Sequence, residues 1–119
     1  MGSMHTGLEE AKNGFERLAT YLAERARGQV GLIVTGGVAP NRAGWVAPFA
    51  GKLTSQKEAN QHRIVTDAVH KEGGKICMQI LHAGRYGYHT LAVGTSNIKS
   101  PVSPFKPWKL TQSVVKRTI

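Results

Sequence analysis

The sequence is poor in cysteine and acidic residues, and it has no long hydrophobic run. Cys77 is the single cysteine among 119 residues, which excludes an intrachain disulfide and argues against a cysteine-based metal site. It lies in the apolar segment 76–81, so we predict a buried, inert thiol. No apolar stretch reaches the length of a membrane span, and the N-terminus lacks the features of a signal peptide. We therefore predict a cytoplasmic protein with no membrane partner.

The shortage of acidic residues leaves a strongly basic chain. Sixteen Lys and Arg residues face seven Asp and Glu residues, for a net charge of +9. Such an excess raises the hypothesis of nucleic-acid binding. The basic residues are scattered, however, and no RNA-binding pattern of alternating aromatics and glycines occurs. We predict a solvated basic surface and no nucleic-acid partner.

A first helix and strand are indicated near the N-terminus. Residues 13–27 place apolar side chains at helical spacing, and Asn13 with Glu16 resembles a capping box. Gly28 is the expected C-cap. The β-branched, continuously apolar run 30–35 predicts a strand buried on both faces.

The same order is repeated further along the chain. Ser55 and Glu58 form a second helix start, for a helix that ends near Glu72. The apolar segment 76–81 then predicts a second buried strand. Strands that alternate with helices predict an α/β fold with parallel pairing through right-handed crossovers.

Both ends of the chain look unlike those of a complete domain. Residues 1–7 are typical of the end of a strand and its following loop, and the sequence from Gly94 onward predicts a loop. Two strands cannot close a barrel, and open parallel edges would expose backbone donors and acceptors. We therefore expect residues 1–119 to be an incomplete domain that is truncated at both ends.

Three clusters follow the expected strands, at the end where ligands bind in α/β folds. They are Ser3-Met4-His5, Thr35-Gly36-Gly37 and the segment 79–85. The amide of Gln79 stands within an apolar run and must find hydrogen-bond partners. It can donate and accept at once, which suits the carbonyl and N–H edge of a flavin ring. A satisfied structural amide is the alternative.

Two charged or titratable residues follow Gln79 in a glycine-containing turn. His82 and Arg85, three residues apart, could orient a substrate or an anion, or could pair within the loop. The other histidines show no metal-ligand spacing with acidic residues, so no metal site is predicted.

These motifs carry a family resemblance. Residues 1–8 (MGSMHTGL), 24–40 and 73–88 (GGKICMQILHAGRYGY) resemble the bacterial NADPH-dependent 2,4-dienoyl-CoA reductases, members of the old yellow enzyme group. The likeness continues through 41–53 and 98–102. It implies a partial (β/α)8 TIM barrel, here its N-terminal βα units only, that binds FMN. It also implies a longer enzyme in which electrons pass from NADPH through FAD and an iron–sulfur cluster to FMN. FMN would then reduce an unsaturated fatty acyl-CoA during fatty acid degradation.

The resemblance also assigns roles to single residues. It implies flavin contacts for Ser3, Met4, His5, Gly37 and Gln79 and, less directly, substrate contacts for the family's H-x-G-R turn, here His82 and Arg85. The family's proton-donating tyrosine belongs to a later strand, beyond Ile119, so the isolated chain is expected to be inactive. Two alternatives stay open. The parent enzyme could be another ene reductase of the group, or the chain could be a non-enzymatic partial barrel that self-associates through its open sheet edges.

Overall fold

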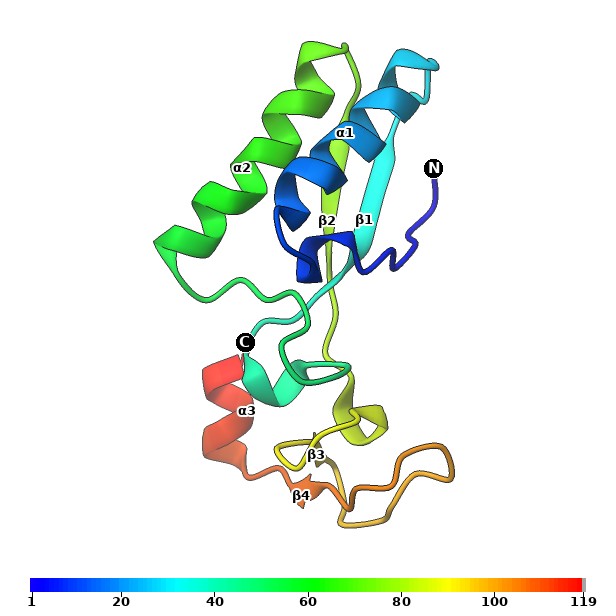
Figure 1. Cartoon of the computed structure of the whole chain (residues 1–119). Coiled ribbons are helices and arrows are strands. Elements are labelled where there is room, and N and C mark those ends of the chain that lie inside the picture. The colour runs from blue at the N-terminus through cyan, green and yellow to red at the C-terminus, as the bar shows by residue number, and fades with distance from the viewer. Residues whose placement is uncertain (119) are drawn as a thin grey trace. The chain divides into compact units, whose positions relative to one another are not determined.

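The computed structural model describes residues 1–118, with side chains up to Lys116, and has an α/β architecture (Figure 1). The chain divides into two compact units. The first unit consists of residues 1–37 and 53–79, and the second consists of residues 38–52 and the chain from Ile80 onward. Each unit is described by itself below.

The two predicted long helices are confirmed in the first unit. Helix α1 spans Gly14–Arg27 and helix α2 spans Gln56–Lys71. The predicted start of α2 is confirmed in detail, because the Ser55 hydroxyl accepts a hydrogen bond from the Glu58 N–H at 3.3 Å. At the other end, Gly73 has φ 77°, a left-handed conformation that glycine adopts without strain.

The predicted cap of α1 is wrong. Asn13 is the N-cap residue, but it has φ 54° and its side chain makes no capping hydrogen bond. A short 3-10 helix, η1 (Leu8–Glu10), contacts helix α1 near this end. Asparagine is one of the few residues that tolerate this left-handed backbone.

Strands β1 (Ile33–Val38) and β2 (Ile76–Ile80) are neighbours in one sheet. The Ile33 N–H donates to the Lys75 carbonyl at 2.8 Å, and the Leu81 N–H donates to the Val38 carbonyl at 3.0 Å. The N-terminal ends of β1 and β2 are therefore paired with each other, as are their C-terminal ends. The strands run parallel, as predicted.

Strand β1 is shifted relative to the prediction. It begins three residues later than the predicted segment 30–35 and includes Gly36, which was expected to lie after the strand. Gly36 is needed within the strand because the N-terminal segment approaches it closely. A Cβ at Gly36 would lie 3.0 Å from the Met4 carbonyl oxygen. Only glycine lets that segment pass over the strand at this distance.

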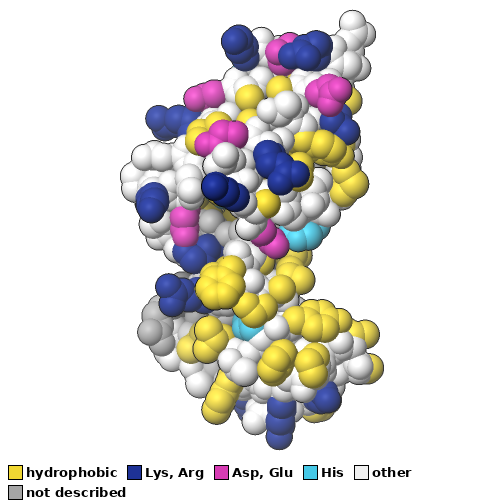
Figure 2. Space-filling model, viewed as in Figure 1, with side chains coloured by type: hydrophobic (Ala, Val, Ile, Leu, Met, Phe, Trp, Pro, Cys, Tyr) yellow, Lys and Arg dark blue, Asp and Glu magenta, His cyan; other side chains and the backbone are white. Residues whose placement is uncertain are grey.

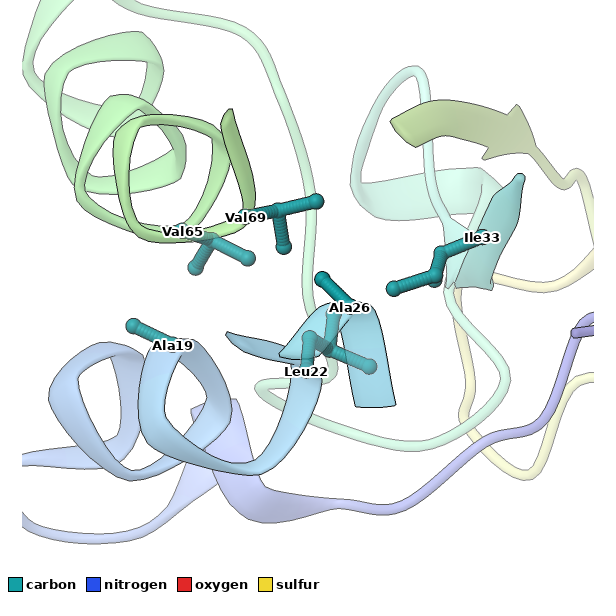
Figure 3. Close-up of a cluster of buried hydrophobic side chains, with 6 residues drawn as sticks. All are labelled: Ala19, Leu22, Ala26, Ile33, Val65 and Val69. Atoms are coloured by element: carbon teal, nitrogen blue, oxygen red, sulfur yellow. The ribbon is translucent and has the colours of Figure 1, made fainter. Parts of the chain in front are cut away.

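The core of the first unit lies between the two helices and β1 (Figure 3). Ile33 and Val69 are fully buried, and full burial of such a side chain stabilises a fold by about 1.5–3 kcal/mol. The cluster comprises Ala19, Leu22, Ala26, Ile33, Val65 and Val69.

The prediction that β2 is buried on both faces is wrong. Cys77, Gln79 and Ile80 are exposed, and so the predicted buried thiol is an exposed one. Exposed Cys77 and Gln79 alternate with half-buried Ile76 and Met78, so one face of β2 has no cover among the described residues. A strand that is central in a closed barrel would be covered there.

The second unit contains structure that the sequence analysis assigned to a loop. The short strands β3 (Val93–Gly94) and β4 (Trp108–Lys109) pair in parallel, and helix α3 spans Gln112–Thr118. Two 3-10 helices, η2 (Arg42–Gly44) and η3 (Gly84–Tyr86), complete the unit. No helix of the described residues is long and apolar enough to span a membrane.

Candidate functional site

A pair of polar side chains lies at the carboxyl end of β2, where the sequence predicts a ligand site. The Ser3 hydroxyl donates a hydrogen bond to Gln79 Oε1 at 2.6 Å. The backbone N–H of Gln79 donates to Thr35 Oγ1 at 3.1 Å. The Thr35 side chain in β1 therefore holds the backbone of β2 at this position. No described residue accepts a hydrogen bond from Gln79 Nε2, and the residue is exposed. The amide therefore keeps its donor end available for a ligand.

The N-terminal segment is held beside β1 by its backbone. The Met1 nitrogen donates to the Leu32 carbonyl at 2.6 Å, and the Val34 N–H donates to the Met1 carbonyl at 3.0 Å. This pattern places Met1 beside Ile33 as a residue of a parallel strand would lie. The segment then carries Ser3 to Gln79 and Met4 over Gly36.

The backbones of all five predicted flavin-contacting residues lie near one another in the first unit, since the Cα atom of His5 would lie 3.2 Å from a Cβ at Gly36. Ser3 and Gln79 are hydrogen-bonded, Met4 contacts the backbone of β1, and Gly37 lies in β1 next to Gly36. Such a set combines an amide, a hydroxyl and accessible backbone, which is what recognition of a polar heterocycle requires. The contacts of these residues with a flavin stay a prediction.

The side chain of His5 lies beside an acidic residue of η1. Its Nε2 lies 3.4 Å from Glu10 Oε1, and Glu9 belongs to the same group of possible ligands. The three side chains thus form a group of possible metal ligands that the sequence patterns did not indicate, while the absence of a metal site stays a prediction. The spacing of one histidine with two glutamates four and five residues later was a signal that sequence reasoning missed.

His82 and Arg85 lie together in the second unit, around η3. The Gly84 N–H donates to His82 Nδ1 at 3.1 Å, a bond that only the neutral imidazole can accept. Burial lowers the pKa of His82 below its ordinary value of 6.5, and nearby His89 lowers it further. The Arg85 guanidinium carbon lies 5.3 Å from the centre of the Tyr86 ring.

These residues line a groove of about 330 Å³. Its wall is largely apolar and includes Val93 and Leu110, so the groove offers a neutral hydrogen-bonding imidazole and a positive charge beside apolar surface. Tyr86 also lines the groove, a role that sequence reasoning missed. Its position next to Arg85 in the turn was the available signal. Substrate contacts for His82 and Arg85 stay a prediction.

Known proteins resemble this chain over nearly its whole length. Residues 1–117 match the model of the NADH:flavin oxidoreductase / NADH oxidase family. The chain is 32% identical over 123 residues to a metal reductase of Desulforamulus reducens, covering all of this chain and 18% of that protein. It is 34% identical over 98 residues to an N,N-dimethylglycine/sarcosine dehydrogenase of Chromohalobacter salexigens, covering 73% of this chain and 14% of that protein.

The comparison with solved structures shows the fold. The structure of the old yellow enzyme homologue from Zymomonas mobilis superimposes with a TM-score of 0.78 and 23% identity, over 97% of this chain and 36% of that one. The predicted fold, the N-terminal βα units of a (β/α)8 barrel, is thereby confirmed. The chain spans less than a fifth of the length of the two curated relatives named above.

Proposed function

Because the chain belongs to the NADH:flavin oxidoreductase / NADH oxidase family, we propose that it forms one wall of an FMN site in an old yellow enzyme-like oxidoreductase. The observation that carries the proposal is the exposed Gln79 amide, held by Ser3 at the carboxyl end of β2. FMN, when bound, supplies hydride transfer between a nicotinamide and the substrate.

The residues of the first unit would bind and orient the flavin ring. The Ser3–Gln79 hydrogen bond fixes the amide so that its Nε2 donors face away from the hydroxyl. Gly37, next to Gly36 in β1, has no side chain, which would let a flat ligand approach the strand closely. Met4 would cover the ring from the N-terminal segment, as an exposed and adaptable side chain does.

We also propose a substrate class. The resemblance of residues 73–88 to 2,4-dienoyl-CoA reductases supports an unsaturated acyl thioester, reduced with NADPH. The groove with neutral His82 and cationic Arg85 suits a carbonyl oxygen or an anionic group beside an apolar chain. In the longer enzyme, FAD and an iron–sulfur cluster would bind outside residues 1–119. Another ene reduction of the same group is the alternative.

An FMN titration followed by NMR tests the flavin site directly. We expect millimolar FMN to shift the amide signals of Ser3, Gly36, Gly37 and Gln79 in the full chain. Gln79→Leu removes the donors without adding bulk, and we expect it to weaken FMN binding about tenfold, since a lost hydrogen bond to a buried ligand group costs about 1–3 kcal/mol. Gln112→Leu, at an exposed position of α3, is the matched control and should leave binding unchanged.

The proposal is contradicted if FMN causes no localised shifts, or if both leucine variants bind FMN equally well. A second assay addresses activity. The chain alone should show no NADPH-dependent reduction of a dienoyl-CoA, because turnover needs a proton donor and an acceptor pocket beyond this wall. Turnover by the chain alone would refute this expectation of inactivity.

A further inference from the structure

Three metal-ligating side chains converge next to the N-terminal segment of the first unit. His5, Glu9 and Glu10 each offer one ligand atom, and these atoms all lie within 4.8 Å of one another. The closest pair, His5 Nε2 and Glu10 Oε1, is 3.4 Å apart. Two ligands of a tetrahedral zinc ion, each about 2.1 Å from the metal, lie roughly 3.4 Å apart. Two of the three donors are therefore already at ligand spacing.

The third residue has an unsatisfied oxygen. Glu9 Oε2 is inaccessible to solvent and has no hydrogen-bond partner among the described residues. A buried carboxylate oxygen without a partner is costly, and such atoms in a native fold call for an explanation. A cation that Glu9 ligates through this oxygen, together with His5 and Glu10, would satisfy it. No basic side chain forms an ion pair with Glu9 in the described part of the chain.

The backbone that carries the two glutamates is held in place. Glu9 and Glu10 lie in η1, which packs against the start of α1. The contact is so close that a Cβ on Gly14 would lie 2.7 Å from the Glu9 carbonyl carbon. His5 precedes η1 on the same loop, so the ligands come from one short, supported segment. Little backbone ordering would then be needed on binding.

We propose that His5, Glu9 and Glu10 form a binding site for a divalent transition-metal ion, with zinc as the best fit. One imidazole and two carboxylates are ligands that zinc accepts, and a three-residue set leaves one coordination position open for water. The ion would clamp the loop that carries Ser3 onto η1. The inference does not depend on flavin binding, since none of the three side chains contacts Gln79 in the described structure.

Cobalt(II) is the probe for this site, because its visible spectrum reports coordination geometry. The titration uses the full chain in a Cys77→Ser background, since the exposed thiol is a competing ligand. We expect one equivalent of cobalt to bind, to be displaced by zinc, and to raise the melting temperature. His5→Gln and Glu9→Gln should each weaken binding about tenfold or more. His70→Gln, which removes an exposed histidine from the end of α2, should not change it.

The outcomes distinguish a specific metal site from nonspecific binding at the surface. Loss of affinity in both site variants, with the control unchanged, supports the proposal. Equal affinity in His5→Gln and the parent, or equal losses in His5→Gln and His70→Gln, overturns it. Absence of any binding by the parent chain also overturns it. A flavin titration of the Glu9→Gln variant keeps this result separate from the proposed FMN site, which that substitution should leave intact.

Discussion

The His82 imidazole gives the second unit a defined response to pH. Burial holds its pKa below 6.5 in the folded chain, while the unfolded chain takes up the proton near pH 6.5. Between these two values the unfolded state binds more protons, so stability falls as the pH falls below 6.5. Above pH 6.5 both states are neutral at this residue, and it contributes no pH dependence.

We expect an NMR titration of the His82 ring to report a pKa below 6.5. The Gly84 amide signal should move with the same midpoint, because protonation of Nδ1 removes the acceptor of its hydrogen bond. In a His82→Gln variant the titration of the Gly84 amide should disappear. A His82 pKa above 6.5, or a Gly84 amide that still titrates in the variant, would contradict this account.

The place of Gln79 in a strand could be predicted from sequence better than the burial of its side chain. The amide of Gln79 was picked out as a ligand group because it interrupts an apolar run, and the structure provides it with Ser3. Its burial was mispredicted, since an apolar run reports a strand but not how many neighbours that strand has. The direction of the His5 side chain depends on Glu9 and Glu10, whose convergence requires the turn at η1.

At the scale of elements, the start of α1 depends on a glycine. Gly14 is buried, and a Cβ there would lie 2.3 Å from the Leu8 carbonyl oxygen. Glycine-to-alanine changes within helices normally stabilise by about 0.5–1 kcal/mol. Here the added methyl group must displace η1, so we expect Gly14→Ala to destabilise the chain by about 1–3 kcal/mol, the usual cost of overpacking.

Urea unfolding followed by circular dichroism measures this change. Gly28→Ala is the matched control, because Gly28 has φ −74° and its added Cβ would make only ordinary contact, 3.4 Å from the Arg25 carbonyl oxygen. That variant should be neutral or slightly more stable. If Gly14→Ala is as stable as Gly28→Ala, the contact between η1 and α1 does not constrain the fold.

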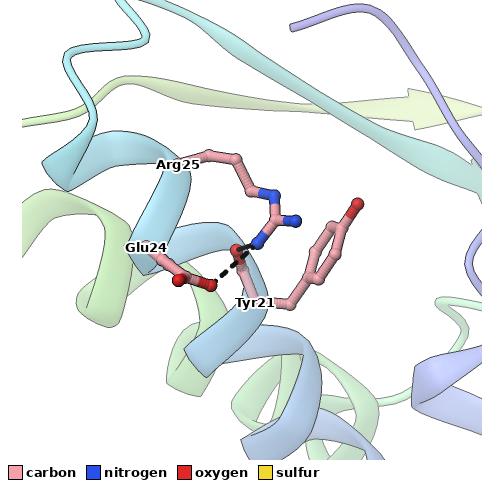
Figure 4. Close-up of polar contacts among 3 residues, drawn as sticks. All are labelled: Tyr21, Glu24 and Arg25. Atoms are coloured by element: carbon pink, nitrogen blue, oxygen red, sulfur yellow. Dashed lines mark hydrogen bonds and ion pairs between the residues drawn. The ribbon is translucent and has the colours of Figure 1, made fainter.

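The elements that could be predicted are those whose signal is local. The apolar stripes of α1 and α2 repeat over several turns, and the Ser55 cap is a short-range pattern. On the surface of α1, Arg25 stacks at 3.4 Å over the Tyr21 ring and bonds to Glu24, again between near neighbours (Figure 4). By contrast, β3 and β4 are two residues each and form through contacts across 15 residues of chain, a separation that leaves no periodic pattern.

At the scale of the whole molecule, many large apolar side chains are exposed to solvent. Figure 2 shows hydrophobic side chains grouped on the surface of the second unit. In the second unit, Trp108 is 69% exposed and Phe49 is 84% exposed. Monomeric proteins rarely leave many large apolar side chains in solvent, and such surfaces serve as interfaces. Open sheet edges could be expected from the two predicted strands. The positions of these exposed side chains could not be predicted.

The open edge of β2 leads to a prediction about self-association. Ile80 is 74% exposed at the end of β2, and no described strand pairs with the far side of that strand. Unpaired strand edges associate with one another, and a lysine on the edge prevents this. We therefore expect the chain to self-associate in a concentration-dependent way in sedimentation velocity experiments, and Ile80→Lys to raise the dissociation constant about tenfold, or by about 1.4 kcal/mol.

Ile98→Lys separates edge pairing from a general effect of charge. Ile98 is 65% exposed and lies outside the strands, so the substitution adds the same charge to an equally basic chain without touching an edge. If self-association uses the β2 edge, Ile98→Lys sediments like the parent chain and only Ile80→Lys shifts toward monomer. If both variants shift alike, net charge controls association and the edge does not. A parent chain that stays monomeric at all concentrations would show that the exposed edge is protected by its own geometry.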